Sequence, residues 1–261
     1  MNNTYLAVLI IFIILIGFYF SGSRNLFLGP IVNKNYDGLY VLEKTGNLYV
    51  SGAARYVGDV ELDNTPATDL EVSHNGYYIL DQSGKVYEFG ETEFYGDANV
   101  ENAVDLEFVE DGYYILDKSG SVLTYGNVEN HGNGKLNNYV DMEATNNGYY
   151  LLTKNGQIET FGAAKLYGDL KNINAMALAV KDNGYYILEE NGKIHFFGNA
   201  QNYGYEILNE NSAKDIEVVP KSNGYYILDG HGNTYSYFAA AGFPGPEYSQ
   251  VIKYIDLELL S

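Results

Sequence analysis

A unit of about 36 residues recurs six times along the chain, and this repetition constrains the fold more than any other feature. The four clearest copies read NGYYILDQSGKVYEFG from Asn75, DGYYILDKSGSVLTYG from Asp111, NGYYLLTKNGQIETFG from Asn147 and NGYYILEENGKIHFFG from Asn183. Weaker copies begin at Asp37 and Asn223. A period of this length is typical of propellers, solenoids and repeat arrays. Because an active site is usually needed once, a residue that recurs in every copy is a poor catalytic candidate.

Each copy has the pattern of a β-hairpin. The segment GYYILD is rich in aromatic and β-branched residues, and a second such run follows it, for example KVYEFG. The four residues between them, such as DQSG from Asp81 to Gly84, suit a type I turn. A third strand of the pattern Asp–apolar–Glu precedes the hairpin. The segments around Tyr95 and Tyr167 predict a short fourth strand.

The strand GYYILD is apolar on both of its faces. In the copy at Asn75, Tyr77 and Ile79 lie on one face, whereas Tyr78 and Leu80 lie on the other. A sheet with one face in water would alternate apolar and polar residues. Both faces are therefore expected to be covered, as in a propeller, where each sheet packs between two neighbours. A β-solenoid is the rival architecture.

The C-terminus carries a strand without a hairpin. Residues Asp256–Leu259 repeat the Asp–apolar–Glu pattern, whereas the first copy has only a poor match to a leading strand at Ile31–Asn33. We therefore predict that the C-terminal strand pairs with the hairpin at Asp37 and closes a ring, which removes exposed sheet edges. A solenoid would instead have dissimilar caps at its ends. The expected fold is all-β: a six-bladed β-propeller over residues 37–261, closed by the C-terminal strand.

The repeat resembles two known patterns. It is similar to bacterial GYW-type repeats, in which Gly-Tyr-aromatic, Asp-x-x-Gly and Phe-Gly recur with nearly this period. It also resembles the regulator-of-chromosome-condensation type of propeller repeat, whose hairpin ends in an aromatic–Gly pair. Both resemblances cover roughly Asp37 to Leu260, and they imply a propeller fold without implying an activity.

The N-terminus predicts one transmembrane helix. From Tyr5 to Phe20 the chain is apolar and uncharged, and the stretch from Thr4 to Gly22 would span about 28 Å as a helix, near the hydrocarbon thickness of a bilayer. A cleaved signal peptide would have a positive charge before the apolar run, and none is present. We expect an uncleaved anchor at residues 1–24, with a signal peptide as the alternative, and a linker at residues 25–36.

The orientation of the anchor rests on analogy. Arg24 and Lys34 follow the helix, so the charge rule favours a cytoplasmic body. A short anchor followed by a Tyr- and Asn-rich β domain is nonetheless common on the outer side of membranes. We therefore predict a single-pass protein with an extracytoplasmic propeller, on a cell envelope or a virus-associated membrane.

The charge of the chain argues against nucleic acid as a partner. The net charge is −19, and because Arg24 is the only charged residue among the first 24, the remainder carries −20. Such a surface repels phosphate backbones. A protein partner, in particular a basic one, fits better. The negative charge can also be explained without any partner, because it keeps a tyrosine-rich β domain soluble.

The Asp–apolar–Glu strand supplies the candidate cation-binding residues. Its carboxylates are Asp69, Glu71, Asp105, Glu107, Asp141, Glu143, Asp215, Glu217, Asp256 and Glu258. The remaining copy has Ala177-Leu178-Ala179. Residues two apart share a strand face. If this strand is innermost, the carboxylates line the channel and suit Ca²⁺ or a basic peptide. If it is outermost, they form a solvated edge that deters aggregation; we favour this second interpretation.

Tyrosines supply the candidate recognition surface. The chain has 27 tyrosines, and those outside the GYY pairs include Tyr56, Tyr95, Tyr167, Tyr203 and Tyr205. Tyrosine suits recognition because it combines a large contact area with a hydrogen-bonding tip. The alternative is that these side chains fill the rim between blades. Asp81, Asp117 and Asp229 are explained by turn chemistry.

No catalytic motif stands out. The chain has no cysteine, no nucleophile elbow and no Walker loop, and its four histidines occupy unlike positions in the repeat. We therefore predict a membrane-anchored, non-enzymatic binding or scaffold propeller without a cofactor, Ca²⁺ being the one candidate ion. The alternatives are a glycan hydrolase or lyase that uses channel carboxylates, and a structural subunit of a surface layer or virion.

Overall fold

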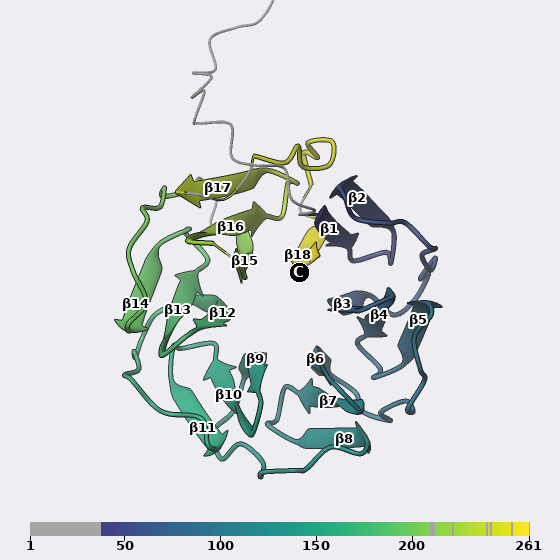
Figure 1. The fold of residues 1–261 in the computed structure, drawn as a ribbon, viewed down its shortest axis with the longest axis horizontal. Helices are drawn as coiled ribbons and strands as arrows, with labels where there is room; N and C mark the ends of the chain where they lie inside the picture. The colour runs from purple at the N-terminus through teal and green to yellow at the C-terminus, as the bar shows by residue number, and fades with distance from the viewer. Residues whose placement is uncertain are drawn as a thin grey trace, which may run out of the picture. The chain divides into compact units, whose positions relative to one another are not determined.

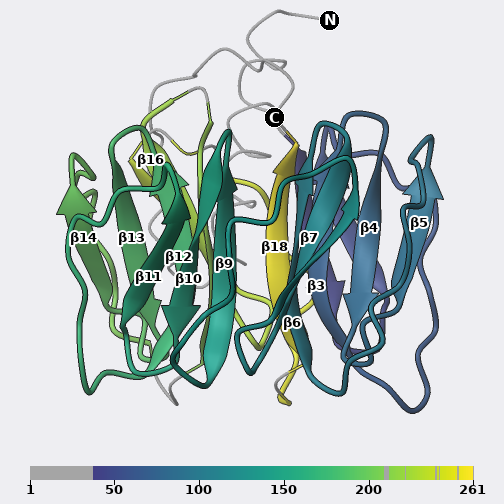
Figure 2. The same cartoon turned by 90° about the horizontal axis from the view of Figure 1, so that it is seen from below.

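The computed structural model describes residues 38–208, 212–220, 222–238, 240, 242–251 and 253–260. These residues form six antiparallel sheets of three strands each and no helix. The sheets surround a central axis like the blades of a propeller, and their strands run along that axis (Figures 1 and 2). We number the sheets in chain order, each given from its inner strand to its outer strand.

The strand bounds follow the repeat. Sheet 1 is β18 (Tyr254–Leu260), β1 (Gly38–Glu43) and β2 (Leu48–Gly52); sheet 2 is β3 (Ala67–Ser73), β4 (Gly76–Asp81) and β5 (Val86–Gly90); sheet 3 is β6 (Ala103–Val109), β7 (Gly112–Asp117) and β8 (Val122–Gly126). Sheet 4 is β9 (Tyr139–Thr145), β10 (Gly148–Thr153) and β11 (Ile158–Gly162); sheet 5 is β12 (Ala175–Lys181), β13 (Gly184–Glu189) and β14 (Ile194–Gly198); sheet 6 is β15 (Ala213–Val218), β16 (Gly224–Asp229) and β17 (Thr234–Phe238).

The predicted ring closure is confirmed. Strand β18 from the C-terminal end pairs with β1, with Val41 opposite Leu257 in an antiparallel register (Figure 1). An ion pair between Lys253 Nζ and Glu43 Oε1, 2.6 Å apart, joins the same two parts of the chain. The C-terminal end of the chain therefore supplies the inner strand of sheet 1, and the ring closes where the first and last copies meet.

The hairpin turns have the predicted chemistry. Asp81 Oδ1 accepts hydrogen bonds from the Ser83 amide at 2.8 Å and from the Lys85 amide at 3.1 Å. Gly84 closes the turn with φ +83°, and a Cβ at this position would lie 2.6 Å from the carbonyl oxygen of Ala98. Only glycine fits this backbone and this contact. The structural role proposed for the turn aspartates is confirmed at Asp81, and Asp117 and Asp229 make equivalent bonds.

The GYY pair ties each sheet to the loops on both of its sides. The first tyrosine reaches back: Tyr113 Oη donates to Gly96 O at 2.7 Å and accepts from Gly96 N at 2.9 Å. The second reaches forward, as Tyr78 Oη donates to Glu93 O at 2.9 Å. The rings of Tyr78 and Tyr113 meet edge to face, with centroids 5.5 Å apart. These tyrosines are buried, which confirms that both faces of the middle strand are covered.

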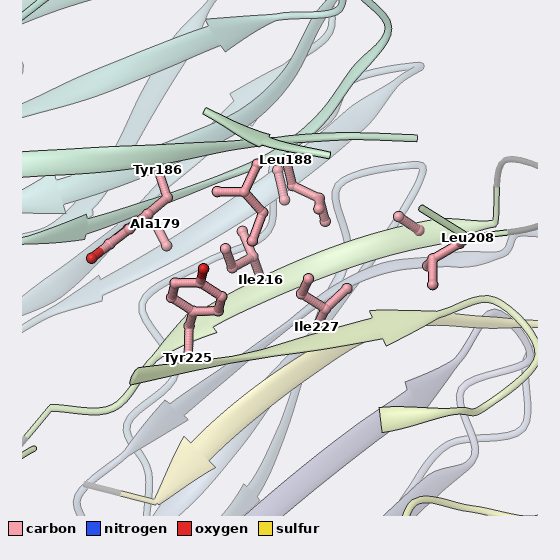
Figure 3. Close-up of a cluster of buried hydrophobic side chains, with 10 residues drawn as sticks. Ala179, Tyr186, Leu188, Leu208, Ile216, Tyr225 and Ile227 are labelled. Carbon is pink, nitrogen blue, oxygen red and sulfur yellow. The ribbon is translucent and has the colours of Figure 1, made fainter. Parts of the chain in front are cut away.

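Apolar side chains fill the spaces between neighbouring sheets. In the described residues, six buried clusters occupy the six interfaces. Figure 3 shows the cluster between sheets 5 and 6, where Tyr186 and Leu188 face Ile216, Tyr225 and Ile227. The hydrophobic stabilisation therefore lies between sheets, and each sheet depends on two neighbours.

The predicted fourth strand is wrong. The loop around Tyr95 contains no strand, and neither does the loop around Tyr167. In the first of these loops Gly96 has φ +136°, a backbone angle outside the range of a β-strand. The loop contacts the outer strand β5 through a side chain and not through paired backbones. Asp97 Oδ1 accepts a hydrogen bond from the amide of Val86, the first residue of β5, at 2.8 Å.

The predicted anchor at residues 1–24 and the linker at residues 25–36 lie outside the described residues. Within the described part, no helix has the length and apolar character needed to cross a bilayer.

Candidate functional site: a channel mouth lined by carboxylates

The Asp–apolar–Glu strand is innermost, so our preferred interpretation of it as an outer edge is wrong. Strands β3, β6, β9, β12, β15 and β18 each pair with the middle strand of their sheet and lie beside the inner strands of neighbouring sheets (Figure 1). An innermost and an outermost strand both leave one side unpaired, which is why the sequence pattern alone did not distinguish them. The candidate carboxylates therefore surround the channel.

The aspartates connect neighbouring inner strands. In each case the Oδ2 atom of the aspartate accepts a hydrogen bond from a backbone amide of the next inner strand. The pairs are Leu106 N with Asp69 (3.0 Å), Leu70 N with Asp256 (2.7 Å), Leu257 N with Asp215 (3.0 Å), Met142 N with Asp105 (2.5 Å) and Leu178 N with Asp141 (2.5 Å). Each bond supplies an acceptor to an edge amide that has no strand partner on that side. The aspartates thus have a structural role, which explains their recurrence.

The glutamates form a second layer along the channel, two residues further along each inner strand. Glu71 Oε1 accepts from the amide of Phe108 at 3.3 Å, and Glu143 Oε1 accepts from the amide of Val180 at 3.2 Å. These bonds are longer than all five aspartate bonds and therefore weaker.

The interface between sheets 5 and 6 lacks both carboxylates. Ala177 and Ala179 replace them in β12, and the amide of Ile216 bonds to the adjacent Asp215 Oδ1 at 2.8 Å instead. Lys181 crosses this interface, where its ammonium group donates to the carbonyl oxygens of Val219, at 2.5 Å, and Ser222. One side of the channel is therefore uncharged at the level of the carboxylates.

The carboxylates hold their protons more strongly than free carboxyl groups do. Burial, as the main cause, raises the pKa of Glu71 to about 8 and that of Asp215 to about 6. Burial and the repulsion between neighbouring carboxylates raise the pKa well above its ordinary value at Asp69, Glu107, Asp141, Glu143, Glu217, Asp256 and Glu258. Burial also raises the pKa of Asp105. A cation in the channel would relieve this repulsion.

The aspartate layer opens into a cavity. Its volume is about 450 Å³, within the range of small-ligand sites. The five aspartates line it, together with Lys44, Lys118 and Lys214. The cavity lies at the hairpin end of the ring, which we define as the end that carries turns such as Asp81–Gly84. Eight carboxyl and ammonium groups thus surround one space.

The candidate tyrosines do not form one surface. Tyr95, Tyr167 and Tyr203 pack against the buried rings of Tyr113, Tyr185 and Tyr225, with centroid distances of 5.5 to 5.8 Å. These three fill the rim between blades, as our alternative interpretation stated. Tyr56 and Tyr205 are more exposed, with 51% and 36% of their surface accessible. Only these two retain the character of recognition residues.

Two features of the structure were missed from the sequence. The first is the set of lysines at the cavity, of which Lys44 and Lys118 occupy one position of the repeat, directly after the first turn residue. The second feature is Phe238, which stands where the five other copies have glycine. It has φ +60°, it is 71% exposed, and its ring stacks on Tyr203 with centroids 4.9 Å apart.

Among the described residues, no group of three or more His, Asp or Glu side chains has the geometry to hold a metal ion. The inner strands place their acceptors around a ring rather than at one point. The suggestion of Ca²⁺ binding stays a prediction.

Comparison with known proteins supports the fold and nothing beyond it. No protein-family profile matches the chain, and no curated protein matches it. A chain from a nidogen/laminin complex superposes with a TM-score of 0.62 at 9% identity, covering 85% of this chain and 98% of that one. A chain from a mitotic checkpoint complex gives 0.53 at 14% identity, covering 80% and 75%. At such identities the likeness concerns the fold alone. The resemblance to GYW-type and chromosome-condensation-regulator repeats stays a prediction.

Proposed function

We propose that this protein is a non-enzymatic binding or scaffold propeller that recognises a positively charged group of a protein partner at the hairpin-end mouth of its channel. The observation that carries the proposal is the aspartate layer, whose five carboxyl groups line one cavity. Burial and, after it, the repulsion between neighbouring carboxylates raise the pKa of Asp69, Asp141 and Asp256, and a bound cation would offset that repulsion. A guanidinium or ammonium group fits such a ring of acceptors because it donates several hydrogen bonds at once.

The arrangement favours binding over catalysis. Glycoside hydrolysis needs two carboxyl groups with different environments and different protonation states. Here the carboxylates occupy equivalent positions of the repeat, and each aspartate accepts a backbone amide bond from the next inner strand. The departures from the repeat, Ala177, Ala179 and Phe238, add no acid, base or nucleophile to the channel.

A membrane anchor completes the proposal. The apolar stretch from Thr4 to Gly22 would hold the propeller at a membrane surface, and we place the propeller on the outer side. Addition of protease to intact cells that express the full chain tests this placement. Digestion of the propeller domain agrees with it, and full protection until the membrane is permeabilised contradicts it.

Calorimetric titration of the protein with a short neutral-flanked arginine peptide, acetyl-Asn-Arg-Asn-amide, tests the cation site. We expect saturable binding that weakens when Asp69→Asn and Asp141→Asn are combined, since asparagine keeps an acceptor oxygen for the inner-strand amide but removes the charge. Glu101→Gln, at an exposed position outside the ring, is the matched control. Equal affinity in the double variant and the control would exclude the aspartate layer as the site.

A further inference from the structure

The cavity at the hairpin end combines charges of opposite sign. Lys44, Lys118 and Lys214 line it together with the five aspartates. Within the part of the chain that the structure describes, none of these three ammonium groups takes part in an ion pair or a hydrogen bond. The two sets of charges therefore line one cavity without an ion pair between them.

The fold places the lysines at the rim of the cavity. Lys44 and Lys118 directly follow the first residue of their hairpin turns, and their backbone amides bond to Lys253 O and Asn102 O, next to the start of an inner strand. Both side chains are exposed. Lys214 belongs to the inner strand β15 and precedes Asp215. Lys44 and Lys118 thus lie on the solvent side of the aspartate layer, whereas Lys214 is half-buried beside it.

The three rim lysines are opposite in sign to the net charge of the protein, although Glu190 occupies the same position of its repeat as Lys44 and Lys118. Residues 25–261 carry a net charge of −20, because Arg24 alone contributes to the net charge of −19 outside that range. A partner selected by overall charge alone would be uniformly basic. A uniformly basic partner would, however, place its outer charges against the lysines, where like charges repel.

Sheet 5 forms a wall of the cavity without a carboxylate. Ala177 of β12 stands where the other inner strands supply an aspartate, and Met176, whose sulfur lies 2.7 Å from Lys154 Nζ, precedes it. Such a wall suits the aliphatic stem of an arginine or lysine side chain. Burial lowers the pKa of Lys214 by more than the nearby carboxylates of Glu190 and Asp229 raise it, so a further anion bound near this ammonium group would favour its charged form.

From this charge order we propose that the partner presents a single basic side chain flanked by acidic residues: the basic group reaches the aspartate layer, its stem lies on Met176 and Ala177, and the flanking carboxylates contact Lys44, Lys118 and Lys214. This inference rests on the proposed function, because it names the partner segment that the same cavity selects. The lysine rim acts as the specificity determinant, whereas the aspartate layer holds the central cation.

Three peptides of equal length test the proposal: acetyl-Asp-Arg-Asp-amide, acetyl-Asn-Arg-Asn-amide and acetyl-Lys-Arg-Lys-amide. We expect the affinity to fall in that order at low ionic strength. The acid-flanked peptide should bind about three- to tenfold more tightly than the neutral one, the range expected for a few partly exposed ion pairs. Selection by overall charge predicts the reverse order.

The triple variant Lys44→Gln, Lys118→Gln, Lys214→Gln supplies the second arm. Its preference for the acid-flanked over the neutral peptide should vanish, whereas Lys165→Gln, at an exposed position on the loop between β11 and β12, should keep that preference. The melting temperature of each variant verifies that the ring is folded. If the lysine variants fail to fold, the comparison of the three peptides on the wild-type protein decides the question.

The outcomes separate the two proposals. If none of the peptides binds, both the proposed function and this inference are wrong. If the basic-flanked peptide binds best, the cation site stands and the inference is wrong. If the acid-flanked peptide binds best but the triple variant keeps this preference, the lysine rim is not its cause, and the inference is again wrong.

Discussion

Acidification from pH 8 to pH 5 should stabilise this protein. The prediction follows from the channel, where burial raises the pKa of Glu71 from an ordinary 4.5 to about 8 and that of Asp215 from 3.8 to about 6. A carboxyl group with a raised pKa binds more protons in the folded state than in the unfolded state. Its stabilising contribution is therefore complete below the unfolded pKa and is lost as the pH rises through the folded pKa.

The magnitude follows from the two numerical values. One pKa unit corresponds to about 1.36 kcal/mol. Between pH 5 and pH 8, Asp215 alone would contribute about 1 kcal/mol and Glu71 about 3 kcal/mol to the change in the free energy of unfolding. The carboxyl groups interact, so their protons are released in steps that belong to the whole set. A total of about 4 kcal/mol corresponds to roughly 10 °C in melting temperature for a domain of this size.

Thermal unfolding by circular dichroism at pH 5, 6, 7 and 8, at constant ionic strength, measures the effect. Glu71→Gln and Asp215→Asn should flatten the pH dependence, since an amide keeps an acceptor for the neighbouring backbone amide but does not titrate. Glu101→Gln, at an exposed position, should leave it unchanged. A melting temperature that falls steadily from pH 8 to pH 5 would refute the reasoning, and so would an undiminished slope in both channel variants.

Three substitutions test the packing of the repeat, each by its melting temperature or chemical denaturation. Tyr113→Phe should destabilise the protein by about 1–3 kcal/mol, because the hydroxyl bonds to both the amide and the carbonyl of Gly96. The control Tyr56→Phe, at an exposed position, should be neutral. Equal effects of the two substitutions would contradict the proposed link between sheet and loop. Gly84→Ala should destabilise by about 1–2 kcal/mol or more, since the residue has φ +83° and a Cβ would lie 2.6 Å from Ala98 O; a neutral result would exclude this backbone. Phe238→Gly should stabilise by about 1 kcal/mol, because Phe238 has φ +60° where five other copies have glycine; a loss of stability would mean that its stacking on Tyr203 outweighs the strain.

The ring could be predicted from the repeat because the signals for it lie close together in the sequence and recur in successive copies. The double-faced apolar strand, the turn glycine and the orphan strand at Asp256–Leu259 each point to sheets packed between neighbours and closed at the ends. Six near-copies of one pattern leave few other ways to bury both faces of every middle strand.

The radial order of the strands was not predictable from the pattern. The inner strand and the outer strand both have one unpaired side, and Asp69 and Glu71 would suit either position. The deciding factor is the bond from Asp69 to the amide of Leu106, which lies 37 positions further along the chain, in the next sheet. A contact of this kind exists only once the ring is assembled.

The candidate site depends on the same long-range assembly. Lys44, Lys118 and Lys214 come from three different sheets, and only the ring brings them to one cavity. The role of the tyrosines was likewise hidden, because the two residues of a GYY pair look alike in sequence but bond to loops on opposite sides of their sheet.

Closure of the ring is the claim on which the channel and its mouth depend, and a zero-length cross-link tests it without any substitution. A carbodiimide joins a carboxylate to an ammonium group only when the two are in contact, as Glu43 and Lys253 are at 2.6 Å although 210 positions separate them in the chain. Mass spectrometry of the treated monomer should find the peptides that contain these two residues joined by an amide bond. The local pair Glu189 and Lys193, 3.6 Å apart, serves as a positive control. A cross-link at the control pair alone would show that the first and last strands do not meet.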